Sequence, residues 1–124
     1  MTAGFIGWSL DPRERDTLLQ RFAPRYPETV ADHVTLKFGD AAEQLPTETF
    51  GEIVGEADDG QGVQAMVVQI GGTTDRPDGS TYHITWSLAP GRRAKESNNV
   101  IRAQGWRRFD IQVPVKLEPR AYPT

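Results

Sequence analysis

The sequence predicts one domain, residues 1–124, that combines several short strands with two helices. A chain of this length supports one sizeable hydrophobic core but not two. The strands are predicted by a recurring period-2 alternation of polar and apolar residues. The helices are predicted by apolar residues at helical spacing between capping and terminating residues.

Strands are expected wherever apolar residues form a short run or alternate with polar ones. They fall at residues 4–10, 33–38, 50–57, 63–70, 83–88 and 109–117. The third and fourth are joined by Asp58-Asp59-Gly60-Gln61-Gly62, a composition typical of hairpin turns. In the last strand, Pro114 indicates an edge position or a bulge, because proline cannot donate to a sheet ladder.

Two helices are expected between these strands. The first spans residues 12–23, with Asp11 as its N-cap and Glu14 where a capping box needs an acid. The second has Ser97 as its cap and ends before Gly105. Both should pack their apolar residues against the sheet.

Two connections are distinguished by their composition. Residues 40–49 are polar and predict an irregular segment with a short helical turn at Ala41 to Gln44. Residues 71–80 hold three Gly, one Pro and two Asp, so we expect this segment to be the most mobile. It leads into the strand at 83–88 and is either a substrate-contacting loop or an ordinary surface loop, with the ordinary loop favoured.

Composition narrows the class of function. The net charge of −3 and the pI near 5.3 argue against a groove for extended duplex nucleic acid and favour a small phosphate ligand or a nucleic-acid end. The chain has no Cys, which excludes a disulfide framework and a thiolate nucleophile. Without a long apolar run or a signal-peptide pattern, we expect a cytoplasmic monomer that does not associate with membranes.

Both histidines of the chain occur in the same pattern, His-aliphatic-Thr-apolar: His33-Val34-Thr35-Leu36 and His83-Ile84-Thr85-Trp86. Strand alternation predicts one polar face on each strand, carrying His33, Thr35 and Lys37 on the first and His83, Thr85 and Ser87 on the second. Two imidazoles suit acid/base chemistry at a phosphorus atom near neutral pH, without a metal. A Thr hydroxyl on the same face can donate to a phosphate oxygen.

The duplicated motif resembles the 2H phosphoesterases. The segment from Tyr82 to Leu88, followed by Lys95-Glu96-Ser97-Asn98, looks most like the "Swiss Army Knife" branch, which is associated with RNA repair. The resemblance implies an α+β fold whose antiparallel sheet forms two pseudo-symmetric halves with two outer helices. It also implies a metal-independent phosphodiesterase that needs no cofactor and acts on nucleotides or RNA ends of the 2',3'-cyclic phosphate type.

Carried over residue by residue, the resemblance implies that His33 and His83 are the catalytic acid/base pair and that Thr35 and Thr85 bind the phosphate. It leaves open which histidine is the base. Two alternatives remain within this class: a catalytically silent nucleotide-binding domain, and a phosphodiesterase for cyclic oligonucleotide signals. A module that uses an exposed sheet edge for protein interaction would leave the paired histidines unexplained.

Further candidates for substrate contacts are Lys37, Ser87, Tyr82, Trp86, Arg92 and Arg93. Tyr82 and Trp86 are able to stack on a base, but strand alternation points them to the core, which is the favoured interpretation. The basic clusters either steer a phosphate or, as is favoured, form a solvated rim; they consist of Arg92, Arg93, Lys95, Arg107 and Arg108. The acidic pairs at residues 58–59 and 75–78 lack the spacing of a calcium loop, so no metal site is expected.

Overall fold

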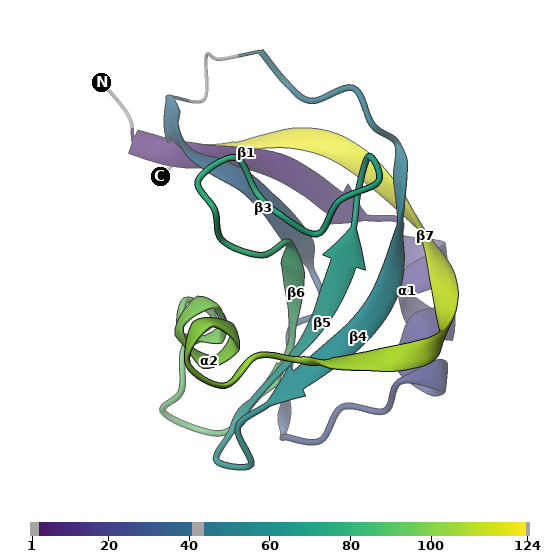
Figure 1. Ribbon diagram of the computed structural model, residues 1–124, viewed down its shortest axis with the longest axis vertical. Coiled ribbons are helices and arrows are strands. Elements are labelled where there is room, and N and C mark those ends of the chain that lie inside the picture. The colour runs from purple at the N-terminus through teal and green to yellow at the C-terminus, as the bar shows by residue number, and fades with distance from the viewer. Residues whose placement is uncertain (1–2, 41–43, 124) are drawn as a thin grey trace.

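The protein is described by a computed structural model that covers residues 3–40 and 44–123. These residues form an α+β structure with one antiparallel sheet and two helices, which confirms the expected general class (Figure 1). The strands are β1 (Ala3–Leu10), β2 (Glu28–Thr29), β3 (His33–Asp40), β4 (Phe50–Asp58), β5 (Val63–Gln69), β6 (His83–Leu88) and β7 (Arg107–Pro123). The helices are α1 (Pro12–Arg21) and α2 (Glu96–Gln104).

The sheet curls until its two ends meet. Its strand order is β2-β6-β5-β4-β7-β1-β3, so β2 and β3, which are neighbours in the chain, lie at opposite ends. Residues 28–31 hydrogen-bond along β6, whereas residues 33–40 pair with β1. The long strand β7 also changes partners, from β4 at residues 107–116 to β1 at residues 117–123, and its bend is visible in Figure 1.

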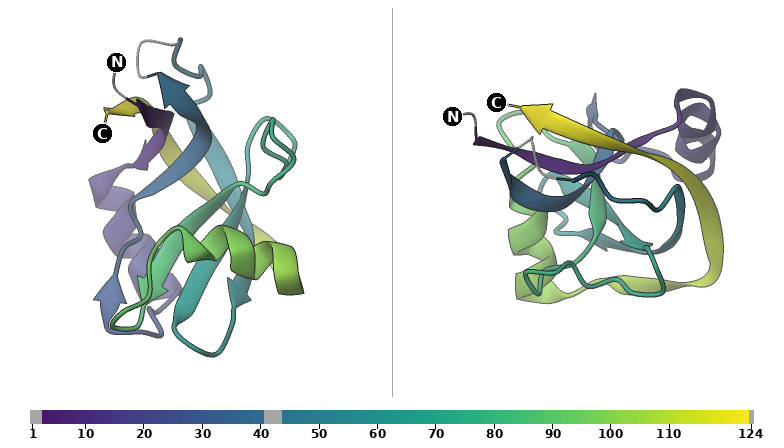
Figure 2. Two further views of the ribbon diagram at one scale, coloured as in Figure 1. Left: turned by 90° about the vertical axis from the view of Figure 1, so that its left-hand side faces the viewer. Right: turned by 90° about the horizontal axis from the view of Figure 1, so that it is seen from above.

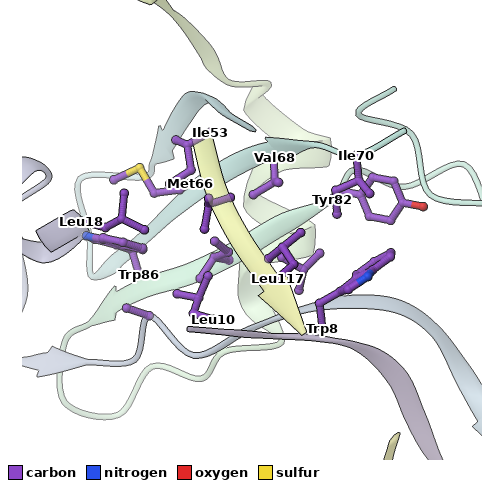
Figure 3. Packing of buried hydrophobic residues seen from close by; sticks show 14 residues of the cluster. Trp8, Leu10, Leu18, Ile53, Met66, Val68, Ile70, Tyr82, Trp86 and Leu117 are labelled. Atoms are coloured by element: carbon purple, nitrogen blue, oxygen red, sulfur yellow. The ribbon is translucent and has the colours of Figure 1, made fainter. Parts of the chain in front are cut away.

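The inner face of the curled sheet holds the main hydrophobic core. Trp8, Met66 and Trp86 pack there with the side chains shown in Figure 3, and Leu18 contributes from α1. Each large apolar side chain that is fully buried stabilises the fold by about 1.5–3 kcal/mol. The inward positions recur with period 2 along the strands, which is why the alternation in the sequence located them.

Helix α2 covers the outer face of the central strands. Ile101 packs against Val54, Ala57, Ala65 and Val67, which form a second, smaller core. The central strands are therefore buried on both faces, and α1 and α2 lie on different sides of the sheet (Figure 2). Neither helix in residues 3–40 and 44–123 is long and apolar enough to cross a membrane.

The helix ends partly match the capping predictions. Asp11 accepts a hydrogen bond from the Arg13 backbone N–H as an N-cap should. The carboxylate of Glu14 does not complete a capping box but accepts from the backbone N–H of Lys116 in β7. Ser97 is not the cap of α2 either, because the helix begins at Glu96 with Lys95 as N-cap.

Several strand predictions are confirmed, with extended ends. β4 and β5 form the expected hairpin, and β7 is longer than the predicted 109–117. Pro114 pairs with Glu52 in the part of β7 that has β4 as its ladder partner, whereas β1 pairs with β7 only at residues 117–123, so Pro114 lies at a local edge. The short helical turn expected at 41–44 falls largely on residues 41–43, which lie outside the described residues.

Candidate functional site

Each motif histidine is the first residue of its strand, and the closure of the sheet brings the two strands together. The backbone N–H of Ala31 donates to the carbonyl of Thr85 in β6, and the chain then turns into β3 at His33. Ala31 is buried with a left-handed φ of 42°, an uncommon conformation for a residue with a side chain. Arg15 of α1 holds this turn, since its Nε donates to the Ala31 carbonyl at 2.8 Å.

The two His-x-Thr pairs line one pocket of about 400 Å³, called here the histidine pocket. Its lining residues are Phe5, His33, Thr35, Phe38, Arg76, His83, Thr85, Ala94, Lys95 and Asn98. The structure therefore brings together the four motif residues that the sequence singled out. A larger hollow of about 590 Å³, which shares Asn98 with this pocket, contains neither histidine.

His83 is held as a neutral imidazole with a defined tautomer. Its Nδ1 lies 2.8 Å from the carbonyl oxygen of Thr81, and because a carbonyl only accepts, Nδ1 carries the proton. Burial lowers the pKa of His83 below its ordinary value of 6.5. The hydrogen bond to the Thr81 carbonyl opposes this lowering, and electrostatic repulsion from Arg76 and His33 adds to it. Nε2 is thus left as a proton acceptor at neutral pH.

His33 has a different environment. Its Nδ1 lies 3.3 Å from Oδ2 of Asp32, a carboxylate that is largely exposed to solvent. The ring packs against Phe5 and Tyr122, with centroid separations of 5.0 Å and 5.4 Å. These contacts orient the imidazole, and among the described residues no hydrogen bond engages its second nitrogen, Nε2.

The two motif threonines also differ. Thr85 is buried, and its hydroxyl donates to the carbonyl of Ala94 at 3.2 Å and pairs with the Ser97 hydroxyl at 2.9 Å. Thr35 is half-buried, and within the described part of the chain no hydrogen bond engages its hydroxyl. The Thr35 hydroxyl is therefore the one that is ready to donate to a ligand.

Each motif strand carries a β-bulge at the residue after its threonine. Leu36 is skipped between the β1/β3 pairs Gly7↔Thr35 and Ile6↔Lys37, and Trp86 is skipped in the β5/β6 ladder. An extra residue reverses the face to which the following side chains point, so the simple alternation fails after Leu36 and after Trp86. Gly7 is needed opposite Leu36, because a Cβ there would collide with the backbone carbonyl of Val34.

The bulges explain why two predicted contacts lie elsewhere. Lys37 pairs with the buried Ile6, on the side away from the histidine pocket. Ser87 is fully buried, where it donates to Gln64 and accepts from the backbone N–H of Arg25 at 3.2 Å. Neither residue lines the pocket.

The remaining predicted contacts do not line the pocket either. Tyr82 and Trp86 are core residues, as strand alternation indicated, and the Trp86 indole donates to the Phe22 carbonyl at 2.7 Å. Arg92 forms ion pairs with Asp59 and Glu96, which tie the β4–β5 turn to α2. Arg93 is exposed beside it, and neither arginine lines the pocket.

Sequence reasoning did not single out several residues of the pocket, among them Phe5, Phe38 and Arg76. Simple strand alternation predicts that Phe38 faces the core, but its side chain is 69% exposed at the pocket, because the bulge at Leu36 turns it around. Arg76 belongs to the Gly-rich segment 71–80, and its guanidinium is almost completely buried in the pocket wall. The only signal for Arg76 was its place in the loop that precedes the second motif.

Among the described lining residues, Arg76 and Lys95 are cations and none is a carboxylate, so the pocket suits an anion although the whole chain is acidic. No group of three or more His, Cys, Asp or Glu side chains suited to a metal ion occurs within the described ranges. No protein-family model, no curated protein and no solved structure matches the chain.

Proposed function

We propose that this chain is a metal-independent phosphodiesterase of the 2H type. One observation carries the proposal: both copies of the His-x-Thr motif, far apart in the sequence, line the same pocket of about 400 Å³. Two imidazoles across one pocket are the arrangement that in-line displacement at phosphorus needs, one to remove a proton and one to supply it. The substrate class we propose is the 2',3'-cyclic phosphodiester of a nucleotide or an RNA end.

The environments of the two histidines favour an assignment of roles. His83 is the base, because it is neutral at neutral pH and its Nε2 has a lone pair. It removes a proton from water as the water oxygen attacks phosphorus. The bond from phosphorus to one ribose oxygen breaks, and the protonated His33 gives its proton to that oxygen. The product is a phosphomonoester beside a free ribose hydroxyl.

The surrounding residues support the same chemistry. The hydroxyl of Thr35 is available for a non-bridging phosphate oxygen, whose charge grows in the transition state. Phe38 offers an exposed aromatic face at the pocket, on which a nucleobase would stack. Such a pocket is in the usual volume range for a small organic ligand, which favours a nucleotide or RNA terminus as the partner.

The pseudo-symmetric two-half architecture of the 2H family, and action in the cytoplasm, are part of this proposal. Support for the symmetry comes from the motif strands themselves. Both strands begin with the motif histidine. In both, the fourth residue of the tetrapeptide has no partner in the ladder; this residue is Leu36 in β3 and Trp86 in β6. Because a bulge is a specific local feature, its repetition at matching positions is an argument for related halves.

One observation favours a second candidate, a catalytically silent nucleotide-binding domain. The Thr85 hydroxyl is already hydrogen-bonded to Ala94 and Ser97, so it would have to exchange these partners before it could bind a phosphate. A silent domain would keep the anion pocket without turnover. A phosphodiesterase for cyclic oligonucleotide signals is the other variant of the proposal.

Incubation with a substrate panel separates these functions. The purified protein and a His33→Ala/His83→Ala double variant are incubated in EDTA with 2',3'-cyclic nucleotides, RNA that ends in a cyclic phosphate, and cyclic dinucleotides. Product from the wild type alone, resolved by chromatography, supports the enzyme and names its substrate class. Ligand-induced thermal stabilisation without product would support the silent domain instead.

A further inference from the structure

Arg76 is a buried cation that takes no part in the proposed mechanism. Its side chain is only 4% exposed, and its Nε has no hydrogen-bond partner among the described residues. A buried donor without a partner is uncommon in a native structure, and it is costly when it belongs to a charged group. Since Arg76 also lines the histidine pocket, an anionic ligand is the natural partner for this donor.

We propose that Arg76 and Lys95 form a second anion site in the histidine pocket, beside the scissile phosphodiester. The preferred substrate then carries another phosphate next to the cyclic one, either as a 5'-phosphate or as the internucleotide phosphate of an oligonucleotide end. The inference rests on the proposed function and deepens it, because it separates such substrates from cyclic mononucleotides with a free 5'-hydroxyl.

Two cations of the pocket lining suit a second phosphate group. Arg76 and Lys95 both line the histidine pocket, and no carboxylate lies among the described lining residues. Asp78, which pairs with Arg76, is not one of the lining residues. A guanidinium also presents donors in a planar fork that fits a phosphate group.

Arg76 is fixed in place by its backbone and by an ion pair. Its backbone N–H donates to the Ser80 carbonyl at 2.7 Å, and its own carbonyl accepts from Gly79, which has the left-handed φ of 90° that suits glycine. Its Nη2 pairs with Asp78 at 3.2 Å. Hydrogen bonds from Ser80, together with Arg76, lower the pKa of Asp78 to about 2, so this carboxylate stays ionised.

The Asp78 pair does not use Nε, which is without a hydrogen-bond partner among the described residues. Asp78 engages Nη2, and its carboxylate is more than half exposed to solvent. Phe38 lies over the same guanidinium, 5.8 Å from Arg76 Cζ to the ring centroid. A ligand phosphate at Nε would therefore lie beside the aromatic face proposed to stack on its base.

The first test compares kcat/KM for three substrates: a 2',3'-cyclic nucleotide with a free 5'-hydroxyl, the same nucleotide with a 5'-phosphate, and a dinucleotide that ends in a cyclic phosphate. For the wild type we expect kcat/KM to be at least about 10-fold higher for the 5'-phosphorylated nucleotide, the dinucleotide or both than for the nucleotide with a free 5'-hydroxyl. Arg76→Gln should collapse this ratio toward one, while Arg76→Lys should retain part of it. A purely structural role would lower the rate for all three substrates equally.

Lys95→Met provides a variant that does not disturb a buried group, because Lys95 is exposed. It should lower the same ratio, whereas Lys116→Met, an equal charge change at an exposed position outside the pocket, should not. Equal rates for the three substrates in the wild type, or no change of the ratio in either pocket variant, would overturn the second anion site and leave the phosphodiesterase proposal standing.

If no substrate is turned over, that result counts against the proposed function, and a binding measurement then tests the anion site separately. Calorimetry then compares a nucleoside 2',5'-bisphosphate with the 2'-monophosphate. The anion site predicts a Kd at least about 10-fold lower for the bisphosphate, and loss of that difference in Arg76→Gln and Lys95→Met. Equal affinities for the two ligands would overturn the inference.

Discussion

His83 donates its Nδ1–H to the carbonyl oxygen of Thr81 across 2.8 Å. A carbonyl cannot donate in return, so this bond fixes the tautomer and leaves Nε2 as an acceptor in the neutral ring. His33 binds a carboxylate, Asp32, with the same nitrogen. Two histidines in one repeated sequence pattern therefore have different partners, and this difference underlies the roles proposed for them.

His83→Asn separates the structural part of His83 from its chemistry. The Asn amide can still donate to the Thr81 carbonyl from a position near that of Nδ1, but it has no counterpart of Nε2. We expect kcat to fall by about 10²–10⁴-fold, the usual contribution of a general base. The midpoint of thermal unfolding should change little. Retained turnover in this variant would contradict the role of His83 as the base.

The pH dependence of stability provides a test that needs no substrate. In the unfolded chain His83 has its ordinary pKa of about 6.5, and in the fold burial lowers that pKa. Between the two values the unfolded state binds more protons, so the free energy of unfolding should fall as the pH drops below about 6.5 toward the folded pKa. Urea unfolding at several pH values measures this slope.

The control for this experiment is a pair of variants. His83→Asn should flatten the pH dependence in that window, whereas His33→Asn should leave most of it, because the lowered pKa belongs to His83. A slope that is identical in the wild type and in His83→Asn would mean that His83 is not held neutral by the fold.

The two threonines should respond in opposite ways to the isosteric change to valine. Thr85→Val leaves the buried Ser97 hydroxyl without its partner and should cost about 1–3 kcal/mol of unfolding free energy. Thr35→Val should leave stability nearly unchanged but lower kcat on the order of 100-fold, as expected for loss of a donor to the transition-state oxygen. Chemical denaturation and turnover are measured on both variants. Loss of stability in Thr35→Val with none in Thr85→Val would contradict these assignments.

Phe38 is expected to act on substrate binding rather than on folding. Its side chain is 69% exposed, so Phe38→Ala should hardly affect stability. Loss of a stacking face typically costs about 1–3 kcal/mol per base, which corresponds to a KM roughly 5- to 150-fold higher. Phe50→Ala is the matched control, because Phe50 is also an exposed aromatic, at 63%, but lies outside the histidine pocket. Equal effects in the two variants would argue against a base platform.

Much of the sheet was predictable because its alternation is local. β1, β4 and β5 appear in the sequence as apolar runs or alternating stretches, and the inward residues Ile84 and Trp86 follow from period 2. The face that carries each His-x-Thr pair was equally predictable. The structure places these residues in one pocket through the closure of the sheet at residues 28–33.

What the sequence did not disclose depends on the partner strand. The bulge at Leu36 exists because Gly7, on β1, has no Cβ to block it, and nothing near Leu36 signals this. Because of that single extra residue, Phe38 rather than Lys37 faces the pocket. Arg76 escaped notice for a similar reason: a charged residue in a Gly-rich loop is usually solvated, and only the tertiary fold buries it.

The most direct test of the account is turnover of a 2',3'-cyclic nucleotide bearing a 5'-phosphate, in EDTA, by the wild type, His33→Ala, His83→Ala and the double variant. If the histidines act as a pair on one phosphodiester, each single change should remove nearly all turnover and the double change should add little, because residues that work as a unit are not additive. Turnover by either single variant close to that of the wild type, or a wild-type rate abolished by EDTA, would contradict the two-histidine mechanism.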